Sequence, residues 1–244
     1  AEEKKRGITI DLGFARLDFP DGSCASVVDV PGHERFIKNM LAGAGGVDLA
    51  MLVVAADEGF MPQTVEHLDI LQLLGVKDGL IVLTKTDLVD EDWLNMLEED
   101  VKSRVKGTFL EDKPILRTSI RTGEGIEALR EALHVLTLHA EEKSARTPFR
   151  LPIDRVFSVD GFGTIVTGTL IDGHIAVGDE AQLMLLGNKC RVRNLQVHGR
   201  DVSAVYAGQR AAVNLAGIKK ESISRGDVLC RTDSMQPSLM LDVK

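Results

Sequence analysis

The stretch "DVPGHERFIKNM", residues 29–40, joins an acidic residue through Pro-Gly to a segment with helical spacing. Four apolar side chains of this segment would share one face of a helix: Phe36, Ile37, Met40 and Leu41. Just upstream, residues 25–30 form an apolar, β-branched run typical of a buried strand. In open α/β sheets, ligands bind where strands end and helices begin. Asp29 is therefore a candidate binding residue, although an Asp here is also a common cap or turn residue.

Apolar runs and helical patterns alternate through the first half of the chain. Three runs are near-continuous and β-branched: residues 25–30, 49–56 and 79–85. Helical spacing separates them, and a further apolar run at 114–120 precedes a helical pattern at 125–143. This alternation predicts an α/β domain with a mostly parallel sheet covered on both faces by helices. Residues 8–30 also predict an antiparallel hairpin that turns at "PDGS", residues 20–23.

The pattern changes near residue 147. From residue 149 onward, short strand-like segments are separated by Gly, Asp and Asn, with no long helical pattern between them. Such a pattern predicts an all-β domain that closes into a barrel. The domain prediction is thus 1–146 for the α/β domain, 147–234 for the barrel, and 235–244 for the start of a further β domain.

Composition and charge narrow the class of protein. No apolar run reaches the ~18 residues of a membrane span, and the first residues lack the apolar segment of a secretory signal. The three cysteines, Cys24, Cys190 and Cys230, are scattered without metal-site spacing. The net charge of -8 divides into -10 for residues 1–146 and +2 for residues 147–244. We therefore expect a cytoplasmic protein with no membrane partner, and place any anionic partner on the second half.

Two segments near the amino end of the chain suit a metal ion and a phosphate. A carboxylate at the position of Asp29 holds Mg²⁺, usually through water, and the amide of Gly32 would bond a phosphate oxygen. In "RGITI", residues 6–10, the hydroxyl of Thr9 is a candidate second Mg²⁺ ligand.

Two later strand ends suit a guanine base. In "TKTD", residues 84–87, the stem of Lys85 would lie over a purine face, while the carboxylate of Asp87 would accept two N–H bonds that adenine cannot supply. Backbone amides in "TSI", residues 118–120, would reach the guanine oxygen. Taken alone, the tetrapeptide also fits a surface lysine beside a capping carboxylate.

These four motifs in order, followed by "GFGTIVTG" in the predicted barrel, resemble the translational GTPases related to elongation factor Tu. The resemblance covers nearly the whole chain. Within that family, "EEKKRGITIDLGFA", "DVPGHERFIKNMLAG" and the Thr in "TKTD" look most like the selenocysteine-specific elongation factors. The resemblance implies GTP or GDP with Mg²⁺ as cofactors, and GTP hydrolysis as the activity.

The resemblance also implies a role for each motif residue. Thr9 would be the Mg²⁺ ligand that senses the γ-phosphate, with Asp29 as the carboxylate behind the metal. Gly32 would report the γ-phosphate through its amide, and His33 would orient the attacking water. The helix from Glu34 would then be a movable switch element.

For the base, the resemblance implies that Lys85 and Asp87 bind guanine and that Ser119 and Ile120 support it. Two residues depart from the family pattern. Thr84 replaces the usual Asn, which removes an amide that braces the nucleotide loops, and Ile120 replaces the usual Ala. The larger departure is that no G-x-x-x-x-G-K-[ST] occurs in the 244 residues. We expect this phosphate loop, with the first strand of the sheet, to lie upstream of residue 1.

In the barrel, the resemblance points to Asp154, Arg155 and Arg210 as a pocket for the selenocysteyl group, with Asp154 bracing an Arg. A selenolate is negatively charged, and arginine supplies fixed positive charge with several donors. The alternative is that these arginines form ordinary surface ion pairs.

The predicted function is thus a GTPase that delivers selenocysteyl-tRNA to the ribosome, with any messenger RNA hairpin recognised only through domains absent from these residues. Two alternatives remain open at this point. One is a general translation GTPase like elongation factor Tu or an initiation factor. The other is that the chain by itself is a nucleotide-free module that binds tRNA or protein.

Overall fold

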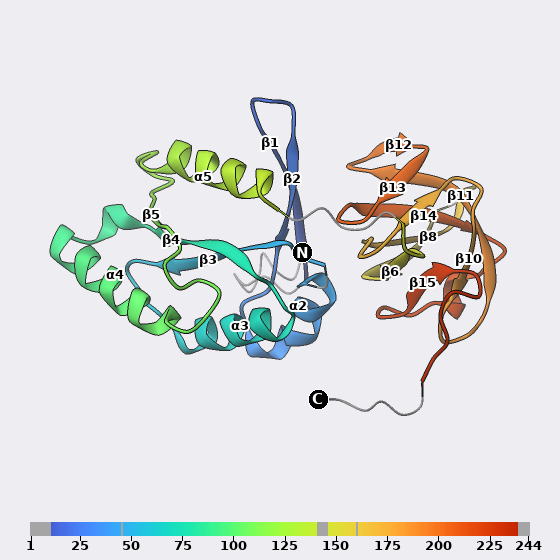
Figure 1. The fold of residues 1–244 in the computed structure, drawn as a ribbon, viewed down its shortest axis with the longest axis horizontal. Helices are drawn as coiled ribbons and strands as arrows, with labels where there is room; N and C mark the ends of the chain where they lie inside the picture. Colours follow the sequence, from blue (N-terminus) through green and yellow to red (C-terminus); the bar gives the residue numbers. More distant parts are fainter. Residues whose placement is uncertain (1–10, 45, 141–145, 160, 239–244) are drawn as a thin grey trace.

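The structure is a computed structural model that describes residues 11–44, 46–140, 146–159 and 161–238. An α/β part and a β-barrel follow one another along the chain and lie side by side (Figure 1). This order confirms the fold class predicted from the sequence. The boundary at residues 146 and 147, and the β domain predicted from residue 235, stay predictions.

A parallel sheet forms the centre of the α/β part. Its strands, in spatial order, are β3 (Leu49–Ala55), β4 (Asp78–Thr84) and β5 (Ile115–Arg117). The register pairs Ala55 with Thr84 and Leu83 with Arg117, so all three strands end at one edge of the sheet. The loops that follow the strands therefore meet at this edge, as expected for a parallel sheet.

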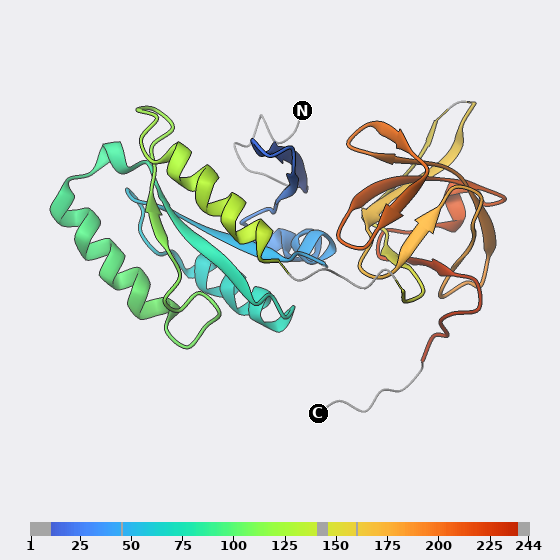
Figure 2. The ribbon, with the colours of Figure 1, turned by 45° about the horizontal axis from the view of Figure 1, so that its top comes forward.

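Helices cover both faces of this sheet (Figures 1 and 2). The three long ones are α3 (Pro62–Leu73), α4 (Glu91–Val105) and α5 (Ile126–Leu138). One core joins α3 and α4 to the sheet through buried leucine, valine and isoleucine side chains: Leu52, Val54, Leu68, Ile81, Leu83, Leu94, Leu97, Val101 and Val105. Burial of each such side chain contributes about 1.5–3 kcal/mol. Helix α5 lies over the opposite face.

The predicted hairpin is confirmed as β1 (Gly13–Asp18) and β2 (Cys24–Asp29), which pair antiparallel across a turn at 19–23. Its tip lies against α5, where the Phe19 ring stacks on the His134 ring with centroids 4.7 Å apart. In the described part of the chain, the hairpin is a separate sheet from β3–β4–β5. The predicted helix after β2 is confirmed too, but its first turn is a 3₁₀ helix, η1 (Glu34–Phe36), before α2 (Ile37–Ala44).

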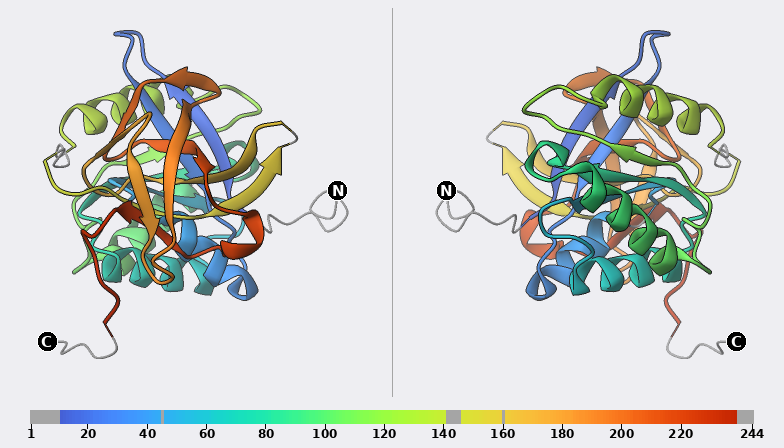
Figure 3. Two further views of the ribbon diagram at one scale, coloured as in Figure 1. Left: turned by 90° about the vertical axis from the view of Figure 1, so that its right-hand side faces the viewer. Right: turned by 90° about the vertical axis from the view of Figure 1, so that its left-hand side faces the viewer.

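The second part is the predicted all-β barrel (Figure 3). Its main sheet has the spatial order β6-β15-β10-β11-β14-β8-β7, with β12 beside β11 and a separate pair of β9 and β13. The strands are β6 (Arg150–Pro152), β7 (Arg155–Val159), β8 (Gly163–Thr169), β9 (His174–Ala176), β10 (Glu180–Leu183), β11 (Lys189–Val197), β12 (Arg200–Val202), β13 (Ala204–Tyr206), β14 (Arg210–Ala216) and β15 (Val228–Arg231). A short helix, η3 (Lys220–Ser222), precedes β15.

The barrel closes because its two end strands, β6 and β7, are successive stretches of chain separated only by Ile153 and Asp154. Ile153 N donates to Asp227 O on one side, and Asp154 N donates to Thr167 O on the other. Both linking residues are buried. Asp154, a predicted pocket residue, therefore occupies the corner at which the barrel closes. Among the described residues, none of the helices is both long and apolar enough to cross a membrane.

The contact between β3 and β4 depends on a glycine. A Cβ on Gly79 would lie 2.2 Å from the Ala50 carbonyl oxygen, a backbone atom that cannot move without shifting β3. We expect Gly79→Ala to lower the free energy of unfolding by about 1–3 kcal/mol, the usual cost of overpacking. Urea unfolding measures this change. Gly32→Ala is the control, since its Cβ would meet only His67 Cε1 at 3.8 Å; an equal loss in both variants would contradict the expectation.

Candidate functional site

The loops after β4 and β5 are tied together by backbone bonds. After β4 the chain forms a 3₁₀ turn, η2 (Thr86–Leu88). Thr86 N donates to Thr118 O at 3.3 Å, and the Thr86 hydroxyl donates to the same carbonyl at 3.1 Å. Thr118 N in turn donates to Leu83 O at 2.8 Å. The "TKTD" and "TSI" motifs, which are 32 residues apart, are thus neighbours in space.

Asp87 and Ser119 form the central contact of this edge. The Ser119 hydroxyl donates to Asp87 Oδ1 at 2.5 Å, and Ser119 is fully buried. Arg121 Nη1 lies 3.5 Å from the other carboxylate oxygen of Asp87. The Ser119 bond foremost, with smaller contributions from the backbone N–H of Asp87 and from the charge of Arg121, lowers the pKa of Asp87. The carboxylate is therefore held ionised in one orientation, as a reader of two N–H donors requires.

The two candidate amides of "TSI" differ in availability. Ser119 N donates to Glu124 O at 3.0 Å within the loop, which leaves it no bond for a ligand. No acceptor is found for Ile120 N in the described part of the chain, and the Ile120 side chain is 90% exposed. Of the two, the Ile120 amide is the free donor.

Thr84 and Lys85 make contacts that the sequence did not predict. Ala56 N donates to Thr84 O at 2.8 Å, and the Thr84 hydroxyl lies 3.5 Å from Val54 O, so Thr84 ties the end of β4 to β3. Lys85 has a left-handed backbone, with φ of 57°, and its Nζ is within 3.3 Å of carboxylate oxygens of Asp57 and Glu58. The signal for this acidic pair was "AADEG", residues 55–59, after the strand predicted at 49–56.

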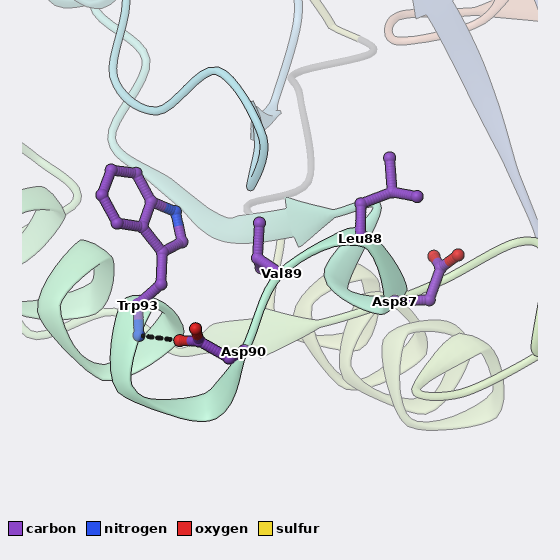
Figure 4. A pocket seen from close by; sticks show the side chains of 5 residues that line it. All are labelled: Asp87, Leu88, Val89, Asp90 and Trp93. Carbon is purple, nitrogen blue, oxygen red and sulfur yellow. Dashed lines mark hydrogen bonds between the residues drawn. The ribbon is translucent and has the colours of Figure 1, made fainter.

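An open depression of about 550 Å³ lies beside Asp87 and is lined by Asp87, Leu88, Val89, Asp90 and Trp93 (Figure 4). Asp87 is at one end of this group and Trp93 at the other. The Asp90 carboxylate caps α4 by accepting from Trp93 N at 2.8 Å. The Trp93 indole N–H donates to Ala56 O at 2.8 Å, which joins the start of α4 to the loop after β3.

The predicted phosphate-side residues come from the other elements. Asp29 ends β2 and is exposed, with no partner for its carboxylate among the described residues. Gly32 and His33 are also exposed, just before η1. Arg35 N donates to His33 Nδ1 at 3.3 Å, and the His33 and Phe36 rings are 5.9 Å apart. Thr9 lies outside the described residues.

The structure joins two of the three predicted barrel residues, Asp154 and Arg210, by direct hydrogen bonds. Arg210 donates to both oxygens of Asp154, at 3.0 and 2.9 Å, and to the Thr167 hydroxyl at 3.1 Å. The same hydroxyl donates to Asp154 at 2.6 Å. Asp154 is only 3% exposed, so its charge is fully paired inside the barrel corner. Arg155, by contrast, points toward the α/β part.

Residues 11–14, which follow the "RGITI" segment, lie over both arginines. Arg155 donates to Leu12 O at 2.8 Å and approaches Asp11 at 3.3 Å. The Arg210 guanidinium lies 3.5 Å from the centroid of the Phe14 ring, and that of Arg155 lies 5.4 Å from it. Sequence reasoning missed Phe14 and Asp11, because nothing local to either residue indicates a partner about 140–200 positions away.

The Asp87–Ser119 bond generates a pH prediction. Since the pKa of Asp87 is lowered in the folded protein, the stabilisation is present at neutral pH and is lost as the pH falls through that pKa. Ser119→Ala should raise the pKa of Asp87 toward its ordinary value, measurable by carboxyl NMR titration. Ser23→Ala is the matched control: it removes the bond that helps lower the pKa of Asp21 to about 2 and should leave Asp87 unchanged. An unchanged pKa of Asp87 in the Ser119→Ala variant would contradict the Asp87–Ser119 hydrogen bond.

Comparisons with known proteins identify the family of both parts of the chain. The family model for the elongation factor Tu GTP binding domain matches residues 1–139, and that for elongation factor Tu domain 2 matches residues 163–230. The selenocysteine-specific elongation factor of Desulfomicrobium baculatum is 48% identical over 244 residues, which are 100% of this chain and 38% of the relative. That of Escherichia coli is 47% identical over 229 residues, 93% of this chain and 37% of the relative.

Solved structures give the same result. A bacterial selenocysteine-specific elongation factor superposes with a TM-score of 0.89 at 39% identity, over 94% of this chain and 40% of that one. Translation elongation factor SelB from Methanococcus maripaludis, in complex with the GTP analogue GppNHp, gives 0.86 at 32% identity, over 92% and 50%. The chain thus spans less than half the length of the curated relatives named above. Because the first family model covers more than half of its residues, the chain belongs to the elongation factor Tu family of GTP-binding proteins.

Proposed function

We propose that this chain is part of a translational GTPase that binds GTP and delivers selenocysteyl-tRNA to the ribosome in the cytoplasm. The observation that carries the proposal is the Asp87 carboxylate, fixed by Ser119 at the edge where three parallel strands end. Identity of 47–48% to selenocysteine-specific elongation factors supports the choice of substrate. We assign recognition of a messenger RNA hairpin to no residue of this chain.

In this proposal, the base site reads guanine. The oxygens of Asp87 accept from the two N–H donors of the guanine edge, and the free Ile120 amide donates to the guanine oxygen. The exposed stem of Lys85 covers one face of the base. Adenine lacks both N–H donors and would leave the Asp87 carboxylate without partners, so it is rejected.

The phosphate side is proposed from Asp29, Gly32, His33 and Thr9. The carboxylate of Asp29 is exposed and has no partner among the residues that the structure describes, so it fits Mg²⁺ bound through water, because Mg²⁺ keeps several of its waters when it binds to proteins. Bound Mg²⁺ would supply charge neutralisation at the phosphates. Gly32 donates its amide to the terminal phosphate, and His33, exposed beside the start of η1, orients the attacking water.

The tRNA site is proposed at the barrel corner, where Asp154 holds Arg210 and Arg155 lies beside Phe14. Two guanidinium groups near one aromatic ring offer charge and an apolar wall to a selenolate side chain. Serine, which is neutral, would gain much less from the same two charges. The main alternative function is a general translation GTPase, for which this corner would show no preference between the two aminoacyl groups.

The guanine site is tested by Asp87→Asn in the whole protein. The carboxamide keeps the size of the side chain but cannot accept both N–H bonds, so GTP affinity should fall roughly 10- to 100-fold. The affinity for xanthosine triphosphate should rise, because the added carbonyl of xanthine accepts from the new amide N–H of Asn. Isothermal titration with the two nucleotides measures the shift. Unchanged affinity for both would mean that Asp87 only caps the turn.

The selenocysteyl pocket is tested by Arg155→Gln. Arg155 is preferable to Arg210, whose removal would leave the buried Asp154 unpaired and destabilise the barrel. Binding of selenocysteyl-tRNA should weaken by about tenfold or more, with little change for seryl-tRNA, because charge-assisted bonds are lost only with the selenolate. Dissociation rates of the two tRNAs measure this difference.

Arg225→Gln is the matched control for that experiment. Arg225 also pairs with Asp11, at 3.4 Å, but in the described structure it has no hydrogen bond or ion pair with Asp154 and no ring contact with Phe14. It should leave both dissociation rates unchanged. An equal loss of both tRNAs in Arg155→Gln would favour a phosphate contact and the alternative of a general translation GTPase.

A further inference from the structure

The loop after β3 carries two carboxylates to the ammonium group of Lys85. Lys85 Nζ is 3.0 Å from both oxygens of Asp57 and 3.3 Å from Glu58 Oε1. These hydrogen bonds, that of Asp57 foremost, raise the pKa of Lys85. The three residues lie on two separate loops, 27 and 28 positions apart. The contact is therefore a tertiary one, formed only when both loops are in place.

The acidic loop is rigidly placed. Glu58 N and Gly59 N both donate to Ala55 O, at 3.1 and 2.8 Å, and Gly59 has a φ of 75° that closes the turn. Ala56, the first residue of this loop after β3, is fully buried and bonded at both ends: its N–H donates to Thr84 O and its carbonyl accepts from the Trp93 indole, each at 2.8 Å. The loop is thus anchored to β4 and to α4. The backbone positions of Asp57 and Glu58 are therefore fixed independently of the conformation of Lys85.

Lys85 is constrained from its own side as well. Its backbone is left-handed, a conformation that a non-glycine residue adopts at a cost, so the direction of its side chain is set by the turn that follows. With the main chain and Nζ both held, the methylene stem between them is fixed. The side chain is still 44% exposed, which leaves the stem open to a flat ligand. The Thr84 hydroxyl is directed to Val54 O and gives Lys85 no support.

We infer that Asp57 and Glu58 are positioning residues that hold Lys85 against the guanine base. The inference rests on the proposed function, since it needs a nucleotide at the Asp87 site. In the empty site the three charges are partly exposed, and such pairs stabilise little. A base lying on the stem excludes water from the pair and strengthens it, so the gain is realised mainly in the complex. The two carboxylates thereby reduce the side-chain ordering that binding must otherwise supply.

The test neutralises both carboxylates without changing their size, as Asp57→Asn with Glu58→Gln in the whole protein. Release of a fluorescent GDP should become faster by about three- to tenfold, the scale of a partly buried ion pair. The difference in release rate between the double variant and the unchanged protein should shrink at 1 M salt, because the Debye length there is roughly 3 Å. Glu99→Gln is the control, because it removes a carboxylate paired with Lys102 on α4, away from the loops, and should leave release unchanged. Unchanged release in the double variant would overturn the inference.

A second arm separates positioning from a general loss of structure. In a Lys85→Met background, which keeps the stem but removes the ammonium, neutralising the two carboxylates should add nothing further. An equal acceleration in both backgrounds would overturn the inference, because the carboxylates would then act without Lys85. Asp57→Glu keeps the negative charge that Asp57→Asn removes. GDP release from the Asp57→Glu variant should therefore be nearly as slow as from the unchanged protein. Hydrogen exchange of the Ala56 amide, which donates to Thr84 O, reports whether the loop is still folded.

Failure of the inference is distinguishable from failure of the proposed function. If Asp87→Asn shifts nucleotide preference while the double variant releases GDP normally, the guanine site stands and the positioning role falls. If Asp87→Asn leaves nucleotide preference unchanged, the guanine site itself is wrong, and the positioning role falls with it.

Discussion

The parallel register of β3, β4 and β5 is the constraint on which the candidate nucleotide site depends. It sets Ala55 beside Thr84 and Leu83 beside Arg117, so three loops leave the sheet at one level. Backbone hydrogen bonds continue this alignment beyond the strands. Ala56 N donates to Thr84 O, and Thr86 N donates to Thr118 O, so each loop is joined to its neighbour. Because these bonds involve main-chain atoms, the relative placement of Lys85, Asp87 and Ser119 does not depend on exposed side chains. The sheet therefore fixes the geometry of this edge, and the side chains on its loops supply the chemistry.

At the barrel corner the geometry depends on a buried charge, the carboxylate of Asp154, and not on strand register. Asp154 stands where β6 passes into β7, and its carboxylate is almost fully removed from water. An unpaired charge there would be costly, so the carboxylate requires Arg210 and the Thr167 hydroxyl. The same bonds hold the Arg210 guanidinium over the Phe14 ring, 3.5 Å from its centroid. The residue that stabilises the corner and the residue proposed to bind an anion are therefore the same arginine, and the two roles cannot be separated by removing it.

Local patterns in the sequence were sufficient for the architecture but not for these contacts. Buried parallel strands are continuous apolar runs, so β3 and β4 were predictable within a residue or two, and the change to short strands near residue 149 predicted the barrel. The "TKTD" and "TSI" motifs could be placed at one edge because parallel strands end together. The Asp57–Lys85 pair was not predictable, because it depends on a closed turn at Gly59 and a left-handed Lys85. Arg210 on Phe14 was not predictable either, because it joins residues 196 positions apart across two domains.

The contacts of residues 11–14 connect the two candidate sites. Asp11 pairs with Arg155 and Arg225, and Phe14 lies on Arg210, so this short segment touches the barrel at three arginines. Thr9, the proposed metal ligand, precedes Asp11 by only two residues, and two residues of chain span at most ~7 Å. Chain connectivity alone therefore keeps Thr9 within this distance of Asp11. A displacement of Thr9 by more than about twice this distance on loss of the γ-phosphate must either carry Asp11 with it or break the contacts of Asp11 with Arg155 and Arg225. A displacement of that size would couple the nucleotide state to the accessibility of Arg155 through covalent geometry, without any long-range network.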